Sequence, residues 1–274
     1  METVKKIIIG CIVAVLLILI FILILSLRVF INKGLEEYNI KKDLGVSRDV
    51  FSAVQKETGL AGEGEVILPR YQFSVGEKLN YFIYSAGIRV GNASITYLGK
   101  QDLGGAAQDV ILVQVKAPGF SDRDIIYGDI ETFSPTKVER QIKLFNEDIE
   151  IIEEYRKDKK EVFITREGKK TTTQKIISDN KIGNIILLLY HFRSNKDKHK
   201  IGERISFNLP TQKLEMFVDK DTAIKVPAGE FQAIFVKSDP ARFKVWFRGS
   251  DRIPLRIQGA IGFGNTYLDL KEVE

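Results

Sequence analysis

Residues 243 to 270 read FKVWFRGSDRIPLRIQGAIGFGNTYLDL. Apolar and polar residues alternate along this stretch, and the alternation is interrupted at Gly249-Ser250-Asp251 and again at Gly262 and Gly264. A period of two residues between turn-forming residues is typical of antiparallel β-strands joined by tight turns. The stretch therefore predicts three successive strands.

The same pattern continues through most of the chain. From Lys78 to Lys237, runs of alternating, β-branched or aromatic residues are separated by turn residues roughly every ten positions. Gly91, inside one such run, indicates a β-bulge. Leu214 to Val218 and Thr222 to Val226 are predicted as two strands joined by a turn. We therefore expect an all-β fold, in which one large antiparallel sheet curls or closes into a barrel-like roll.

One segment has a different pattern. Residues Asn184 to Phe192 follow Gly183 and are apolar on every side, and Asn184 is a suitable N-cap. We expect one short buried helix here, packed against the sheet or filling it. Because the run is short, a further core strand is the alternative.

The N-terminal segment has the composition of a membrane span. Residues 7–27 carry no charge and are built mainly from Ile, Leu, Val and Phe. At about 1.5 Å per residue, a helix of this length covers the roughly 30 Å of a bilayer core. A cleaved signal peptide is the alternative, but its apolar region is normally shorter and ends at small residues, whereas this run ends at Ser26-Leu27-Arg28. An uncleaved anchor is favoured.

The remaining boundaries follow from this span. Residues 1–6 form a short tail, residues 28–65 a juxtamembrane helix and linker, and residues 66–274 the β domain. Lysine and arginine lie on both sides of the span, so the charge distribution does not fix its orientation. A short tail before a first apolar segment is the usual layout of a signal anchor, which places the β domain outside the cytoplasm.

Composition excludes several classes of function. The formal charge is +5 with both signs mixed, and no stripe of arginine and aromatic residues predicts nucleic-acid binding. The only cysteine, Cys11, lies in the predicted span, so we expect no disulfide in the β domain.

Four segments resemble, in order, the motifs of a family of bacterial envelope proteins known only as a domain of unknown function. They are Val75 to Tyr81 (VGEKLNY), Gly87 to Ala93 (GIRVGNA), Val226 to Phe231 (VPAGEF) and Trp246 to Ile257 (WFRGSDRIPLRI). The resemblance covers about Tyr71 to Leu270. It implies an exported, β-rich domain in the periplasm, here anchored in the inner membrane, and it brings no catalytic residues.

The residues themselves also predict no catalytic or metal site and no cofactor. The only histidines are His191, expected to be a packing residue, and His199, expected to be solvated, and no cysteine accompanies them outside the span. No G-x-S-x-G motif is present. The acids from Glu147 to Glu154 alternate with apolar residues and are expected on a solvated face.

Three residues remain candidates for ligand binding. Trp246, the only tryptophan, is either a core residue, which is favoured, or the wall of an apolar cavity. Arg252 and Arg256 can present two guanidinium groups to an anionic headgroup or glycan. The alternative for this region is a turn held by an ion pair between Asp251 and an arginine.

These observations favour a non-enzymatic protein that binds an envelope lipid or polysaccharide inside or along a curled sheet. The alternative is a scaffold that assembles an envelope complex through its strand edges or juxtamembrane helix. A hydrolase is the least supported hypothesis.

Overall fold

The computed structural model describes residues 73–274, except for 195–198, 211 and 260–265. The predicted span and the juxtamembrane segment lie outside these residues. In the part of the chain that is described, no helix has the length and apolarity needed to cross a membrane.

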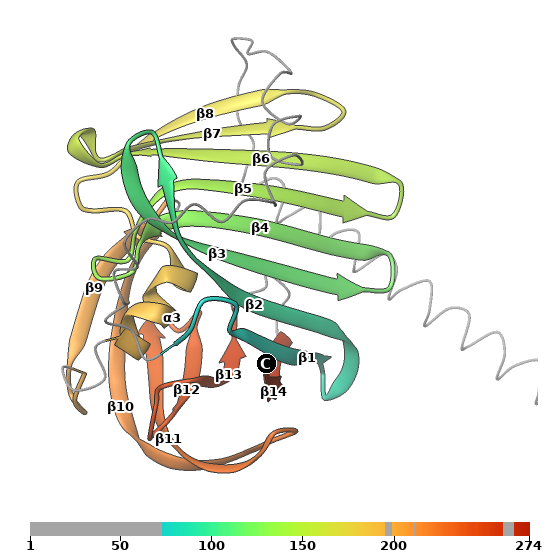
Figure 1. Cartoon of the computed structure of the whole chain (residues 1–274), viewed down its shortest axis with the longest axis vertical. Coiled ribbons are helices and arrows are strands. Elements are labelled where there is room, and N and C mark those ends of the chain that lie inside the picture. The colour runs from blue at the N-terminus through green and yellow to red at the C-terminus, as the bar shows by residue number, and fades with distance from the viewer. Residues whose placement is uncertain (1–72, 195–198, 211, 260–265) are drawn as a thin grey trace, which may run out of the picture. The chain divides into compact units, whose positions relative to one another are not determined.

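Fourteen strands form the described domain, and they belong to one antiparallel sheet (Figure 1). In chain order they are β1 Lys78–Ser85, β2 Ile88–Leu103, β3 Ala106–Ala117, β4 Phe120–Asp129, β5 Ser134–Leu144, β6 Glu147–Arg156, β7 Glu161–Glu167, β8 Thr172–Ile177, β9 Arg204–Leu209, β10 Gln212–Val226, β11 Gly229–Asp239, β12 Lys244–Arg248, β13 Pro254–Gln258 and β14 Thr266–Val273. A 3-10 turn, Lys157–Lys159, lies between β6 and β7, and the helix α3, Ile185–Ser194, lies between β8 and β9. The predicted all-β class with one short α-helix is confirmed for the described residues.

The order of the strands shows how the sheet is assembled. From one edge to the other it is β8, β7, β6, β5, β4, β3, β2, β1, β14, β13, β12, β11, β10, β9. The sheet thus consists of two meanders, β1 to β8 and β9 to β14, which are joined where β1 pairs with β14. Because β8 and β9 do not pair with each other, the sheet is curled but is not a closed barrel.

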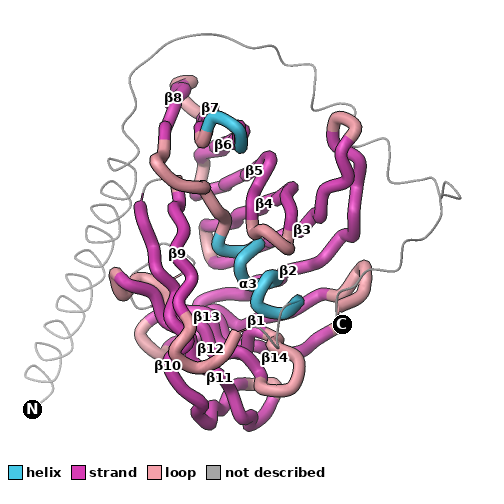
Figure 2. The backbone as a smooth tube through the Cα atoms, turned by 90° about the vertical axis from the view of Figure 1, so that its left-hand side faces the viewer, coloured by secondary structure: helices cyan, strands magenta, loops and turns pink. Residues whose placement is uncertain are grey.

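Helix α3 lies on the inner face of the curled sheet (Figure 2). Asn184 is its N-cap, because its Oδ1 accepts hydrogen bonds from the amides of Ile186 (2.8 Å) and Leu187 (3.3 Å). Apolar side chains of α3 pack against residues of both meanders to form the main core. The sequence-predicted helix and its cap are confirmed, and the alternative of a strand is wrong.

Two details of the strands test the sequence interpretation. The pairing of β1 with β2 shifts its register next to Gly91, as expected for a bulge. The turn predicted between Val218 and Thr222 is wrong: β10 continues through this segment and only shifts its register between Val218 and Lys220. Antiparallel pairing with β11 continues through this segment, keeps the strand continuous and reduces the expected turn to a bulge.

Candidate functional site

The outer face of the sheet, opposite the core, carries a row of aromatic and cationic side chains. Cross-strand pairing places Trp246 opposite Phe235 and Arg256, and places Tyr267 opposite Tyr84. Directly paired residues share a face of the sheet. We call this set the outer-face row; its members are Phe217, Phe235, Trp246, Arg256, Tyr267 and Tyr84.

Trp246 belongs to this row and not to the core. Its chain neighbours Val245 and Phe247 are each 1% exposed and point inward, so the alternation of the strand turns Trp246 outward, where it is half-buried. Trp246 is therefore not the fully buried core residue that was predicted, although its half-buried side chain packs against the core cluster. Because Trp246 and its two chain neighbours are all apolar, the sequence alone does not show which face of this strand is turned toward the core.

Ring contacts link the members of the row across the strands. The ring centroids of Phe235 and Trp246 are 4.7 Å apart, and those of Tyr84 and Tyr267 are 5.2 Å apart in a stacked arrangement. The guanidinium of Arg256 lies between the two pairs, 4.8 Å from the centroid of Tyr267 and 5.9 Å from that of Trp246. These are distances at which cation–π attraction operates.

The charge of Arg256 is already paired. Its Nε and Nη2 donate to the two carboxylate oxygens of Asp269 at 2.5 and 2.7 Å, and these hydrogen bonds raise the pKa of Arg256 further above its usual range. A bidentate pair of this kind fixes the plane of the guanidinium. The guanidinium of Arg256 is therefore a flat, charged group between aromatic rings. Its charge is paired with Asp269, so it is not a free binding site for an anion.

Arg252 does not lie beside Arg256 as the predicted guanidinium pair requires. It occupies the turn between β12 and β13 with a φ of 59° and contributes to lowering the pKa of the buried His199. The ion pair predicted in this turn is present: Arg248 donates to both carboxylate oxygens of Asp251, at 2.8 and 2.5 Å.

A polar groove of about 550 Å³ adjoins the row on the same face. Asp239 pairs with Glu215, and Glu215 pairs with Ser206, so their side chains line one face across β11, β10 and β9. The remaining lining residues are Asn180, Lys181, Asn208, Lys213, Leu214 and Pro240.

Phe217 and Arg204 connect the groove to the row. Phe217 lies two positions after Glu215 on the same strand and hence on the same face. The guanidinium of Arg204 lies 4.8 Å from the ring of Phe217 and donates a hydrogen bond to Glu215. Aromatic surface and hydrogen-bonding groups thus form one continuous strip on the outer face.

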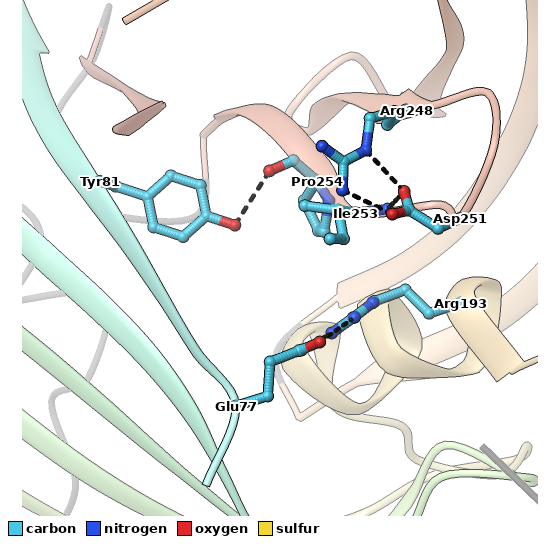
Figure 3. Close-up of polar contacts among 7 residues, drawn as sticks. All are labelled: Glu77, Tyr81, Arg193, Arg248, Asp251, Ile253 and Pro254. Atoms are coloured by element: carbon cyan, nitrogen blue, oxygen red, sulfur yellow. Dashed lines mark hydrogen bonds and ion pairs between the residues drawn. The ribbon is translucent and has the colours of Figure 1, made fainter. Parts of the chain in front are cut away.

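A second cluster lies on the inner face at the C-terminal end of α3 (Figure 3). Arg193, 1% exposed, donates through Nη1 and Nη2 to the two carboxylate oxygens of Glu77 at 2.6 and 2.9 Å. The guanidinium also lies 4.8 Å from the ring of Phe73 and 5.2 Å from that of Tyr190. This buried pair joins α3 to the segment that leads into β1.

Two of the four segments that carried the family resemblance, Val75 to Tyr81 and Trp246 to Ile257, meet near this pair. Tyr81, four positions after Glu77, donates its hydroxyl to the carbonyl of Pro254 at 3.0 Å (Figure 3). Burial raises the pKa of Asp251, but hydrogen bonds from Arg248 and from the amide of Ile253 outweigh it and keep the pKa below its ordinary value. The motif residues therefore hold α3, β1 and the β12–β13 turn together, which is a structural role that their spacing in the sequence did not reveal.

A family model described as "Protein of unknown function (DUF3108)" matches residues 68–271. The chain belongs to the DUF3108 family. This membership confirms the resemblance to a domain family of unknown function. No curated protein matches the sequence.

Two solved structures are similar to this DUF3108 chain at low identity. One is a β-barrel-like protein of the DUF1849 family from Brucella abortus, with 7% identity, a TM-score of 0.42, and coverage of 73% of this chain and 97% of the other. The second is a Bacteroides fragilis protein with a YmcC-like fold, with 8% identity, a TM-score of 0.25, and coverage of 74% of this chain and 98% of the other.

A third cluster of charged side chains faces inward from β4, β5 and β6. Arg140 donates to both carboxylate oxygens of Asp122, and its Nε lies 3.2 Å from Asp124. Glu153 pairs with Val138 across the strands and so lies on the same inner face, where Tyr155 donates to it. The expectation that the acids of β6 occupy a solvated face is thus wrong for Glu153.

The cluster sets an unusual protonation state. Burial raises the pKa of Asp124 to about 8; the nearby Arg140 opposes this effect, while the adjacent Asp122 adds to it. The folded protein therefore keeps Asp124 protonated up to about pH 8, whereas the unfolded carboxyl ionises near 3.8. The unfolded state binds fewer protons between these values, so the free energy of unfolding falls as the pH rises through this window.

Replacing Asp124 with Asn is expected to remove this pH dependence. The variant should gain stability relative to the natural chain by up to about 1.4 kcal/mol for each pH unit between about 4 and 8. Thermal unfolding of both proteins at several pH values measures the difference. Asp148→Asn, at a side chain that is 76% exposed, is the control and should show no such trend. A constant difference between Asp124→Asn and the natural chain at all pH values would contradict the raised pKa.

The two histidines are in contact, and only one matches its prediction. His191 is half-buried, and its Nδ1 lies 3.1 Å from the carbonyl of Ile130, consistent with a packing role. His199 is only 6% exposed and its ring centroid is 5.2 Å from that of His191, so the prediction of a solvated His199 is wrong. Burial first, and then His191, lower the pKa of His199, while Glu203 opposes them.

Within the described residues, no three His, Cys, Asp or Glu side chains are grouped as metal ligands.

Proposed function

We propose that this DUF3108 chain is a non-enzymatic binding protein that takes an envelope polysaccharide along the outer-face row and the adjoining polar groove. The observation that carries the proposal is the continuity of aromatic surface and hydrogen-bonding side chains across β9 to β14 and β1. A sugar ring has apolar C–H faces that pack on aromatic rings, and hydroxyl groups that pair with amide, hydroxyl and carboxylate groups. A strip that offers both kinds of surface over several strands suits an extended polymer.

The packing of the inner face favours this ligand over a lipid held inside the sheet. Leu187, Leu188 and Leu189 of α3 are each no more than 2% exposed. Together with core residues of both meanders, they form one packed cluster between α3 and the sheet, in the space that an enclosed acyl chain would need. We therefore place the ligand along the sheet and not within it.

Binding is a better account of the groove than hydrolysis. Glycoside hydrolysis requires two carboxyl groups that face each other across the substrate and are available to it. Glu215 of the groove is instead engaged by Arg204 and by the hydroxyl of Ser206.

We also propose that the span predicted at residues 7–27 anchors the chain in the inner membrane with the β domain in the periplasm, where such polymers occur.

Trp246 provides a direct test, because it is the only tryptophan of the chain and lies within the row. Adding soluble peptidoglycan glycan strands, or polysaccharide released from lipopolysaccharide, to the purified full-length chain should change its tryptophan fluorescence. Trp246→Ala should weaken binding measured by calorimetry by about tenfold or more, the usual effect of removing an aromatic anchor.

Phe145→Ala is the matched control, because Phe145 is 72% exposed and lies in the turn between β5 and β6, away from the row. It should leave affinity unchanged. The proposal fails if neither polysaccharide binds, or if Trp246→Ala and Phe145→Ala bind equally well.

A further inference from the structure

The two edge strands of the sheet, β8 and β9, differ in the backbone hydrogen bonds on their outer sides. The outer side of β9 is paired with the segment that connects β8 to α3. The amide of Asn208 in β9 donates to the carbonyl of Lys181 at 3.2 Å, and the amide of Gly183 donates to the carbonyl of Asn208 at 2.7 Å. At β8, no described strand pairs with the side that faces away from β7. One edge is thus covered by the protein's own backbone, and the other presents backbone groups with which no described strand pairs.

Strand β8 lacks the features that usually prevent pairing at an edge. Exposed edge strands are commonly protected by proline, by a bulge or by charged side chains. The sequence of β8, TTQKII, contains no proline, and its pairing with β7 runs without a register shift. It carries one charged side chain, Lys175, which forms an ion pair with Glu161 of the neighbouring strand β7 at 2.6 Å. At its end, Ile177 is 68% exposed.

The direction of the backbone groups along β8 follows from one hydrogen bond. The amide of Ser178 donates to the carbonyl of Lys160 at 3.0 Å, toward the β7 side. Because amide and carbonyl groups alternate sides along a strand, those of Thr173, Lys175 and Ile177 point to the unpaired edge. These residues are the donors and acceptors that a further strand would meet.

We propose that this edge is an interface with a second copy of the chain, in which β8 pairs antiparallel with β8 of the partner subunit. A two-fold axis between antiparallel strands runs perpendicular to the sheet, and directly opposed residues share a face. Two registers place a residue near the centre of β8 on this axis. With Lys175 on the axis, two ammonium groups oppose each other, which is unfavourable.

The register with Gln174 on the axis avoids this repulsion. It pairs Gln174 with Gln174 of the partner subunit, Thr173 with Lys175 of the partner subunit, and Thr172 with Ile176 of the partner subunit. It also brings the Lys169-Lys170 turn of one copy near the 90% exposed Asp179 of the partner subunit, so the charges at the ends of the interface are complementary. Because β8 is complementary to a second copy of itself in this register, a second copy of the chain is favoured as the partner over an unrelated extended peptide.

Disulfide trapping tests the register. In a background with Cys11→Ser, which removes the only cysteine, Gln174→Cys is expected to form a disulfide-linked dimer under mild oxidation. The pair on the axis is a non-hydrogen-bonded pair, whose Cα atoms lie about 4.5 Å apart, within the range that a disulfide can span. Thr172→Cys is the matched control on the same face of β8, and its opposite residue would be Ile176, so it should crosslink far more slowly.

Thr173→Pro tests the interface without depending on the chemistry of cysteine. The amide of Thr173 points away from β7, so proline there removes a hydrogen bond of the dimer and none of the sheet. Light scattering of the purified full-length chain should show a dimer in the micromolar range that Thr173→Pro converts to monomer. The melting temperature of this variant should equal that of the natural chain diluted until it is monomeric.

Three results would overturn the proposal. The first is a chain that remains monomeric, with Gln174→Cys no more reactive than Thr172→Cys. The second is preferential crosslinking of Lys175→Cys, which would exclude the register. The third is crosslinking of Gln174→Cys in membranes to a different protein, which would assign the edge to another partner.

Discussion

Replacing Arg193 with Met is expected to lower the free energy of unfolding by about 3–5 kcal/mol, the usual cost of removing one partner of a buried ion pair. The change leaves the carboxylate of Glu77, whose side chain is 14% exposed, without its two charge-assisted hydrogen bonds. It also removes the cation that lies between Phe73 and Tyr190. Urea unfolding followed by circular dichroism measures the loss.

Two comparisons make this test specific. Lys225→Met removes an ion pair of similar length, 2.7 Å, whose side chains are 80% and 73% exposed, and it should cost less than about 1 kcal/mol. The double variant Glu77→Leu/Arg193→Met removes both charges and should be more stable than Arg193→Met alone, because no uncompensated charge remains. Equal losses for Arg193→Met and Lys225→Met would show that the inner pair does not hold α3 to β1.

Leu187→Ala is expected to cost about 2–5 kcal/mol, because it opens a cavity between α3 and the sheet. Leu187 is fully buried, and its Cδ1 lies where α3 crosses Gly128 of β4. Ile88→Ala, at a side chain that is 70% exposed, removes similar apolar volume and should change stability by no more than about 0.5 kcal/mol. Thermal or urea unfolding compares the two variants.

Gly128 offers a further check on this packing. A Cβ atom at this position would lie 2.5 Å from Cδ1 of Leu187 and 2.6 Å from the carbonyl oxygen of Ser134. Gly128→Ala alone should therefore destabilise the protein through overpacking. Combined with Leu187→Ala, which removes one of the two clashes, it should cost less than the sum of the separate changes. Strictly additive losses would contradict direct packing of Leu187 on Gly128.

Local patterns in the sequence were sufficient to predict the strands, the helix and its cap. The register shift next to Gly91 matches the expected bulge, and Asn184 caps α3 as expected. Each of these features depends on alternation or on capping within a few residues. The boundary error at Val218 to Thr222 arose because polar residues that resemble a turn are held in one strand by continuous pairing with β11.

Contacts between distant segments could not be predicted in the same way. Arg193 follows an apolar segment at the end of a helix, where a charged residue normally reaches solvent, and only the approach of Glu77 makes its burial possible. Of the predicted ligand-binding residues, Trp246 and Arg256 do lie together because β12 pairs with β13, whereas Arg252 faces a different part of the domain. The extension of their row to Tyr84 depends on the long-range pairing of β1 with β14, which carries no signal in one sequence.

The pairing of β1 with β14 also bears on how the chain folds. The backbone groups of Lys78 and Glu274 exchange two hydrogen bonds of 2.9 Å, although these residues are 196 positions apart. Within each meander, by contrast, every strand pairs with a neighbour in the chain. Local hairpins form quickly, whereas contacts across a long loop carry a large entropic cost and form slowly. We therefore expect docking of the two preformed meanders to be the slow step of folding. Until it occurs, the unpaired edges of β1 and β14 are the surfaces most prone to aggregation.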